Sequence, residues 1–226
     1  MRILENETFV LTGDSVTDCG RARPVGEGNG MNLGDGYPRF IHALLDSVYP
    51  QRHIRVLNTG VSGNTSRDLR ARWQTDVLDL KPDWVSVMIG INDVWRQMDL
   101  PLRPDCHVYP DEYRENLCWM VEQTLSHVKG MLLISPCFME PLRQDAMRAS
   151  ADAYAAIARE VAQRYHIDFV DAQAEMDRYF RHYHTAAMSW DRVHPNHVGH
   201  MLIAHAVLNK LGFDWNYAED GGSSAR

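Results

Sequence analysis

The chain has 226 residues, enough for one substantial hydrophobic core, and its 45% hydrophobic and 23% charged residues are typical of a globular protein. The formal net charge is −7 and the Lys and Arg residues are scattered, which argues against nucleic acid or an anionic membrane as a partner. The N-terminus lacks the apolar run of a signal peptide, and no stretch approaches 18 apolar residues, so we expect a cytoplasmic protein.

In chain order, apolar and β-branched runs predict strands at residues 9–12, 54–58, 84–89, 131–135 and 167–170. Helical patterns alternate with them at residues 37–48, 66–80, 111–127, 143–165 and 196–211. Strands buried on both faces and separated by helices pair in parallel. The sequence therefore predicts an α/β fold, a three-layer α/β/α sandwich with a five-stranded, parallel, doubly wound sheet of the flavodoxin-like kind.

The domain organisation follows from this pattern. We expect one domain over residues 1–213 and a partly disordered C-terminal tail over residues 214–226, where Asp, Gly and Ser accumulate. Cys19, Cys106, Cys118 and Cys137 are widely spaced without a C-x-x-C pair, which predicts free thiols. In a doubly wound sheet the ligand crevice lies at the carboxyl ends of the strands, so functional residues are expected directly after each strand.

A candidate nucleophile follows the first predicted strand, where Gly13-Asp14-Ser15 places a serine hydroxyl at a strand-to-loop turn. A serine needs a base within hydrogen-bond reach and a third group that orients the base. Asp191 and His194 stand three residues apart near the other end of the chain, and Pro195 biases His194 toward an extended backbone. We predict that Asp191 binds Nδ1 of His194 and leaves Nε2 to take the Ser15 proton.

Acyl transfer also requires hydrogen-bond donors for the oxyanion that forms on the substrate carbonyl. Gly63 lies in a turn-rich stretch after the second predicted strand, where a glycine N–H can approach a ligand closely. Asn92 follows the third strand and offers a side-chain amide. We predict an oxyanion hole made of the Ser15 N–H, the Gly63 N–H and Asn92.

These blocks, in this order, resemble the GDSL family of hydrolases, also called the SGNH family after its serine, glycine, asparagine and histidine. The matching segments are Gly13-Asp14-Ser15, Gly63, Gly90-x-Asn92-Asp93 and Asp191-x-x-His194-Pro195. Val16 stands where the family name has leucine, and both residues are apolar. Residues 15–23, 60–74 and 84–96 are most similar to intracellular bacterial acetyl xylan esterases within this family. That resemblance implies removal of acetyl groups from xylo-oligosaccharides.

Further expectations concern substrate contacts and assembly. Trp190, beside Asp191, could stack on a sugar ring, although tryptophans are more often packing residues. Asp14 is a second candidate for substrate contact, with bracing of its loop as the alternative. The resemblance implies no cofactor and no metal, and enzymes of this type often form homo-oligomers. The same oxyanion chemistry also fits a lysophospholipase or thioesterase.

Structural and non-catalytic alternatives exist for each motif. Singly, the serine, glycine and asparagine blocks could be turns or helix caps, and we expect Asp18, Asp93 and Arg96 to be structural. His197 and His200 follow His194 at intervals of three, but the H-E-x-x-H pattern of a metal site is absent. The glycine-rich stretch 26–36 could suit a nucleotide-, flavin- or carbohydrate-binding module, yet it lacks a phosphate-loop motif and leaves Asp191 and His194 unexplained.

Overall fold

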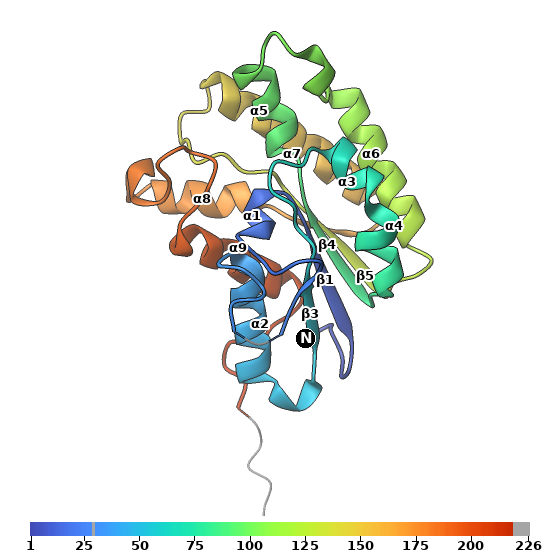
Figure 1. The fold of residues 1–226 in the computed structure, drawn as a ribbon. Helices are drawn as coiled ribbons and strands as arrows, with labels where there is room; N and C mark the ends of the chain where they lie inside the picture. Colours follow the sequence, from blue (N-terminus) through green and yellow to red (C-terminus); the bar gives the residue numbers. More distant parts are fainter. Residues whose placement is uncertain (29, 219–226) are drawn as a thin grey trace, which may run out of the picture.

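The computed structural model describes residues 1–28 and 30–218, with a twisted sheet at its centre and helices on both sides of it (Figure 1). The strand order is β2-β3-β1-β4-β5-β6. The strands are β1 (Thr8–Gly13), β2 (Gly26–Glu27), β3 (Arg55–Asn58), β4 (Trp84–Met88), β5 (Gly130–Ile134) and β6 (Asp168–Val170). All pairs are parallel except β2 with β3. The predicted five-stranded parallel sheet is confirmed, and β2 adds a short antiparallel edge.

Helices form the two outer layers. They are α1 (Ser15–Asp18), α2 (Tyr37–Val48), α3 (Ser66–Ala71), α4 (Trp73–Asp76), α5 (Ile91–Asp99), α6 (Pro110–Thr124), α7 (Ala146–Arg164), α8 (Ala172–Phe180) and α9 (His197–Lys210). Short 3₁₀ turns are η1 (Pro50–Arg52), η2 (Leu78–Leu80), η3 (Pro104–Cys106) and η4 (Thr185–Ala187). One hydrophobic core joins the sheet to α2, α8 and α9, and a second joins it to α3 to α7 (Figure 1). The three-layer sandwich is therefore confirmed.

The alternation of side chains along the central strands explains why both cores form. In β4, Trp84 and Met88 belong to the core under α2 and α9, whereas Val85 and Val87 belong to the core under α6 and α7. Successive residues of a strand point to opposite faces, so a continuous apolar run fills both cores at once. This is the physical reason why such runs predict central strands.

The strand order places a topological switch point at β1. Within the sheet, β3 pairs with one flank of β1. The next strand in the chain, β4, pairs with the other flank of β1. At such a point the loops after neighbouring strands diverge and leave a crevice at the carboxyl ends. The five parallel strands thus have the flavodoxin-like order, and the loops after β1, β3 and β4 border one crevice.

Several helices differ from the sequence prediction. The pattern at residues 66–80 is divided into α3, α4 and η2, because the backbone leaves helical geometry at Arg72. Helices α1, α5 and α8 were not predicted. Helix α1 has only 4 residues, too few for a periodic pattern, and α5 follows Gly90 without a side-chain cap, so it lacks the usual start signal.

The C-terminal segment is described as far as residue 218. Tyr217 packs against Tyr49 with ring centroids 4.5 Å apart, and Gln51 donates a hydrogen bond of 2.7 Å to its hydroxyl. Residues 219–226, for which the sequence predicts disorder, lie outside the described residues, and the domain boundary at residue 213 stays a prediction. No helix in the described part of the chain is both long and apolar enough to cross a membrane.

Candidate active site

Ser15 is the first residue of α1, directly after β1. The chain turns sharply at Gly13, where an added Cβ would lie 2.1 Å from the carbonyl oxygen of Met88 on the neighbouring strand. Only glycine permits this close approach of two backbones. Asp14 then caps α1, because its side chain accepts a hydrogen bond of 3.0 Å from Val16 N. The turn and the cap together position the Ser15 hydroxyl at the carboxyl end of the sheet.

His194 reaches Ser15 from the loop before α9. Ser15 Oγ lies 2.8 Å from His194 Nε2, although the two residues are 179 positions apart. On the other side of the ring, His194 Nδ1 lies 2.6 Å from Asp191 Oδ2. An ionised carboxylate only accepts hydrogen bonds, so Nδ1 carries the proton and Nε2 accepts from the serine hydroxyl. The structure thus brings the three predicted residues into one hydrogen-bonded row.

Asp191 is fixed by hydrogen bonds to its second oxygen. Oδ1 accepts from the backbone N–H groups of His194 at 2.8 Å and Val193 at 2.9 Å, and from Ser189 Oγ at 3.0 Å. Burial alone would raise the pKa of Asp191, but the hydrogen bonds from the His194 side chain and from the two backbone N–H groups outweigh it and lower the pKa to about 2. Asp191 is therefore ionised at neutral pH and oriented toward His194.

Gly63 has the geometry of a backbone donor. Its φ is +83°, in the region that glycine adopts without strain, and a Cβ there would meet nothing within 4 Å. Within residues 1–28 and 30–218, no acceptor is hydrogen-bonded to its N–H. A free backbone N–H beside open space is what an oxyanion donor requires.

Asn92 is held at both ends of its amide. Asn92 Nδ2 donates a hydrogen bond of 3.0 Å to Asn64 O, and Asn92 Oδ1 accepts one of 3.3 Å from Arg96. These contacts fix which end of the amide is nitrogen and use one of its two N–H groups. The second N–H is left for another acceptor. Arg96, expected to be structural, acts here as an anchor for Asn92.

The two candidate substrate contacts lie in contrasting places. Asp14 is only 1% exposed, and burial raises its pKa to about 7. The structure therefore places Asp14 inside the protein, where it braces the loop, and not at the surface that a substrate meets. Trp190 is 89% exposed beside Asp191, so its ring is open to a ligand. The ring centroid of Trp95 lies 6.0 Å from that of His194.

The histidines that follow His194 at intervals of three, His197 and His200, lie on α9. His200 is buried, accepts a hydrogen bond of 3.3 Å from Tyr37 N through Nδ1, and lies 3.4 Å from Cys19 Sγ through Nε2. Burial, and then the nearby His194, lower its pKa to about 4, so it is neutral. No group of three or more His, Cys, Asp or Glu residues that could hold a metal is found among the residues described. The four cysteines are free thiols, as predicted.

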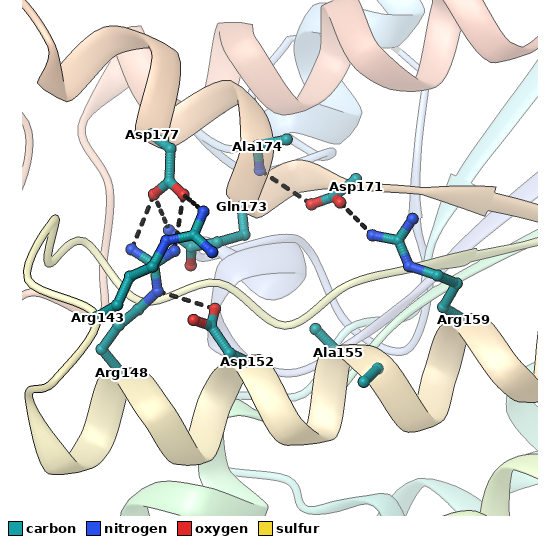
Figure 2. Close-up of a pocket in the computed structure, with 10 residues that line it drawn as sticks. Arg143, Arg148, Asp152, Ala155, Arg159, Asp171, Gln173, Ala174 and Asp177 are labelled. Atoms are coloured by element: carbon teal, nitrogen blue, oxygen red, sulfur yellow. Dashed lines mark hydrogen bonds and ion pairs between the residues drawn. The ribbon is translucent and has the colours of Figure 1, made fainter.

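A cavity between α7 and α8 lies apart from this row of residues (Figure 2). Its charged groups are paired with one another: Arg148 binds Asp177 and Asp152, and Arg159 binds Asp171. Arg148 is 1% exposed, so its pair with Asp177 joins α7 to α8 from within the protein, whereas the pair of Arg159 with Asp171 lies at the surface. Because its cations and anions neutralise each other, the cavity presents no free charge for a ligand.

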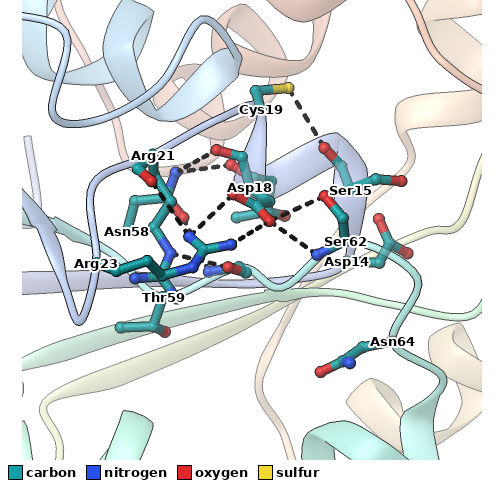
Figure 3. A network of polar contacts seen from close by, with 12 residues as sticks. Asp14, Ser15, Asp18, Cys19, Arg21, Arg23, Asn58, Thr59, Ser62 and Asn64 are labelled. Atoms are coloured by element: carbon teal, nitrogen blue, oxygen red, sulfur yellow. Dashed lines mark hydrogen bonds and ion pairs between the residues drawn. The ribbon is translucent and has the colours of Figure 1, made fainter.

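The sequence predicts Asp18 and Asp93 to be structural, but it gives neither their partners nor the part that Arg72 plays. Asp18 joins α1 to Ser62, and Arg72 donates hydrogen bonds of 2.7 Å to Thr59 O and 2.9 Å to Gly13 O (Figure 3 shows the Asp18 contacts). Asp93, fully buried, accepts from Ser66 N at 3.0 Å, and burial raises its pKa to about 7. These contacts join residues far apart in the sequence, so no local spacing signals them. Their only sign is a charged residue beside a motif block.

The fold and this hydrogen-bonded serine, histidine and aspartate define a hydrolase of the serine esterase class. The chain belongs to the GDSL-like Lipase/Acylhydrolase family, whose model matches residues 11–202. The resemblance noted in the sequence is thereby confirmed.

Known proteins similar to this chain agree with that assignment. A protein named acetylxylan esterase from Geobacillus stearothermophilus is 49% identical over 215 residues, which cover 95% of this chain and 98% of the relative. The crystal structure of Axe2, an acetylxylan esterase from the same organism, superposes with a TM-score of 0.93 at 49% identity and covers 95% and 98% of the two chains. LAE5, an alpha/beta hydrolase enzyme from the metagenome of Lake Arreo, gives a TM-score of 0.92 at 50% identity over 94% and 98%.

Proposed function

We propose that this esterase removes acetyl groups from acetylated xylo-oligosaccharides, with Ser15 as nucleophile, His194 as general base and Asp191 as the carboxylate that orients the base. The observation that carries the proposal is the row of hydrogen bonds from Ser15 Oγ through the His194 ring to Asp191, at 2.8 Å and 2.6 Å. Catalytic mutants of Axe2 have been made at the same three residue types and numbers, S15A, D191A and H194A, which supports these roles.

In the first half of the proposed reaction, Ser15 Oγ attacks the acetyl carbonyl carbon while its proton passes to His194 Nε2. The carbonyl π electrons move to oxygen and form a tetrahedral oxyanion. When the carbonyl re-forms, the bond to the sugar oxygen breaks, and His194 gives its proton to that oxygen. The products are a free sugar hydroxyl and an acetyl group bound to Ser15.

In the second half, a water molecule takes the place of the sugar. Its oxygen attacks the acetyl carbon while His194 Nε2 accepts one of its protons. The second oxyanion collapses, the bond to Ser15 Oγ breaks, and the proton returns to the serine. Acetate leaves. Asp191, ionised and held by two backbone N–H groups, stabilises the imidazolium that forms in each half.

The proposed oxyanion hole consists of Ser15 N–H, Gly63 N–H and the second N–H of Asn92. The Ser15 N–H is at the first position of α1, where a helix leaves its N–H groups without intrahelical partners. The positive φ of Gly63 and the anchored amide of Asn92 fix the other two donors before substrate binds. Donors that need no rearrangement stabilise the oxyanion most effectively.

The acetylated oligosaccharide substrate is supported by the relatives. Axe2 is described as an acetylxylan esterase and as an acetyl-xylooligosaccharide esterase. The exposed ring of Trp190 offers an apolar face on which a sugar could stack. The chemistry requires no cofactor, since water and the three side chains supply every proton and bond.

Two further proposals concern the localisation and the oligomeric state of the enzyme. We propose a cytoplasmic enzyme, which cell fractionation would test. We also propose a homo-oligomer, because enzymes of this type often associate. Light scattering of the purified chain at several concentrations measures its mass and checks this expectation.

Acetate release from acetylated xylo-oligosaccharides tests the proposal, with long-chain acyl esters assayed under the same conditions. The wild-type chain is expected to prefer the acetylated sugars, Ser15→Ala to lose turnover, and Asn92→Ala to lose on the order of a hundredfold in kcat. A preference for long-chain acyl esters would contradict the sugar substrate and favour a lipid or a thioester as the substrate. Normal turnover by Ser15→Ala would remove the nucleophile assignment.

A further inference from the structure

A buried carboxylate joins the helix of the nucleophile to the loop of the oxyanion donor. Asp18 Oδ2 accepts hydrogen bonds from Ser62 N at 2.8 Å and from Ser62 Oγ at 2.9 Å, as Figure 3 shows. Arg23 approaches the same carboxylate from the solvent side, at 2.6 Å from Oδ2 and 3.1 Å from Oδ1. The Asp18 side chain is only 3% exposed. Asp18 therefore holds Ser62 from within the protein.

Asp18 and Ser62 are each close in the chain to a residue of the proposed reaction. Asp18 lies three positions after Ser15 on α1, and residues at that spacing share one face of a helix. Ser62 directly precedes Gly63 in the chain. A single pair of side-chain contacts thus connects the turn that carries the nucleophile to the peptide unit that carries the Gly63 N–H.

Neither helix α1 nor Gly63 would hold its position without contacts from other residues. Helix α1 has 4 residues, and so short a helix is not stable by itself. Gly63 has no side chain to pack, and its N–H is unbonded in the part of the chain that the structure describes. The direction of that N–H is therefore set by the residues on each side of it.

Other anchors hold the residues on either side of Ser62, such as Val61, whose N–H donates to Gly13 O at 3.0 Å. Arg21 Nε donates to Gly60 O at 2.8 Å, and Arg72 binds Thr59 O and the Asn64 side chain at 2.7 Å each. Among the described residues, Asp18 is the only hydrogen-bond partner of Ser62. Movement of Ser62 is thus restrained by one carboxylate.

We propose that Asp18 is a positioning residue for the oxyanion hole, which fixes the Gly63 N–H relative to Ser15 by holding both donors of Ser62. This inference rests on the proposed function, because it assigns Asp18 a part in the same acyl transfer. It gives a role in catalysis to a residue that touches neither substrate nor the reacting atoms.

The chemistry of the carboxylate suits this role. Burial would raise the pKa of Asp18, but hydrogen bonds from Arg23 and from Ser62 outweigh it and keep the pKa below its usual value. Asp18 is thus ionised and can accept from both Ser62 donors at once. Arg23 is 51% exposed in its side chain, so we expect its own energetic contribution to be small.

Kinetics of Asp18→Ala and Asp18→Asn test the proposal. The alanine variant frees Ser62, and a donor that is misplaced by about 1 Å should lower kcat by roughly tenfold to a hundredfold while KM stays nearly constant. The asparagine variant keeps an oxygen for both Ser62 donors, so it should recover most of kcat. A boronic acid that forms a tetrahedral adduct on the serine should lose affinity for the alanine variant by the same factor as kcat/KM.

Glu7 provides a matched control at the other end of β1, directly before its first residue. It is 2% exposed, like Asp18, and accepts three hydrogen bonds of 2.8 Å, from Leu4 N, Trp84 Nε1 and Lys129 Nζ. Glu7→Ala and Glu7→Gln should lower the thermal midpoint without lowering kcat of the folded enzyme. Arg23→Ala should also retain kcat, because it leaves the two Ser62 contacts in place.

A second variant covers the case in which Asp18→Ala does not fold. Ser62→Ala removes one of the two contacts and should lower kcat by roughly fivefold, the worth of one hydrogen bond, again with KM unchanged. Normal kcat in the Asp18→Ala and Ser62→Ala variants, or an equal loss of kcat in Glu7→Ala, would overturn the proposal. Loss of turnover in Ser15→Ala alongside normal turnover in Asp18→Ala would overturn this inference alone and leave the proposed function intact.

Discussion

Replacing Asp191 by asparagine should disable the general base by reversing its tautomer. Asp191 Oδ1 accepts from two backbone N–H groups and from Ser189 Oγ, so the carbonyl oxygen of an asparagine would occupy that position. The amide NH₂ would then take the place of Oδ2 and donate to His194 Nδ1. The proton of the neutral imidazole would move to Nε2, where it blocks acceptance of the Ser15 proton.

The magnitude follows from two losses. Inverting the tautomer removes the short hydrogen bond from His194 Nδ1 to the charged Asp191 carboxylate, which contributes about 2–3 kcal/mol. The imidazolium that forms during the reaction also loses its counter-ion, which costs about another 2–3 kcal/mol in a partly buried site. Together these terms raise the barrier by about 5 kcal/mol, which corresponds to a loss of roughly 10³–10⁴ in kcat.

The assay is steady-state hydrolysis of an acetyl ester by wild type, Asp191→Asn and Asp191→Ala. The alanine variant imposes no wrong tautomer, so Asp191→Asn should fall at least as far as Asp191→Ala. Asp145→Asn is the matched control, because Asp145 also accepts from two backbone N–H groups, those of Met147 and Arg148, and asparagine caps a helix equally well. An Asp191→Asn enzyme within tenfold of wild type would refute the reasoning.

Three further predictions concern the donor loop and the buried charges. Gly63→Ala meets no steric clash but strains an L-residue at φ +83° by about 1 kcal/mol, so the backbone should relax and displace the N–H, and kcat should fall about fivefold with KM retained in the same assay; an unchanged kcat would contradict the donor role. Asp93 has its folded-state pKa raised to about 7, above its unfolded value near 4, so its contribution to stability is complete below pH ~4 and is lost as pH rises through 7. The thermal midpoint of Asp93→Asn should therefore rise relative to that of wild type as the pH increases from 5 to 8. A difference between the two thermal midpoints that stays constant over this range would exclude a neutral Asp93. Arg148→Ala leaves Asp177, beside the cavity of Figure 2, with Gln173 at 2.9 Å and Arg143 at 3.4 Å, and it should lower the free energy of unfolding by about 2–3 kcal/mol in urea titration, whereas a change below about 1 kcal/mol would mean that the pair is well solvated.

The sheet could be predicted from the sequence because its strands are buried on both faces. A run such as residues 84–89 is apolar at nearly every position, and the two cores on either side of β4 account for that composition. The same logic led to the site, since Ser15, Gly63 and Asn92 each follow a strand whose carboxyl end faces the crevice. Convergence of these ends is a property of the fold and needs no long-range signal.

The remaining features depend on contacts that no local pattern encodes. Strand β2 has 2 residues and exists only through its pairing with β3. The break between α3 and α4 occurs at Arg72, whose guanidinium reaches Gly13 O and Thr59 O from that position. Asp18 and Ser62 are 44 positions apart. Such anchors become visible only when the chain is folded, because their partners share no periodicity with them.

Labelling with a fluorophosphonate tests most directly whether Ser15 is the nucleophile. The oxygen of an activated serine attacks the phosphorus of this reagent and displaces fluoride, which gives a stable covalent adduct. Peptide mapping by mass spectrometry then identifies the labelled residue. We predict a single label on the peptide that contains Ser15, loss of activity in proportion to labelling, and no label in Ser15→Ala. A label on another residue that accompanies inactivation, or full activity after Ser15 is labelled, would contradict this prediction.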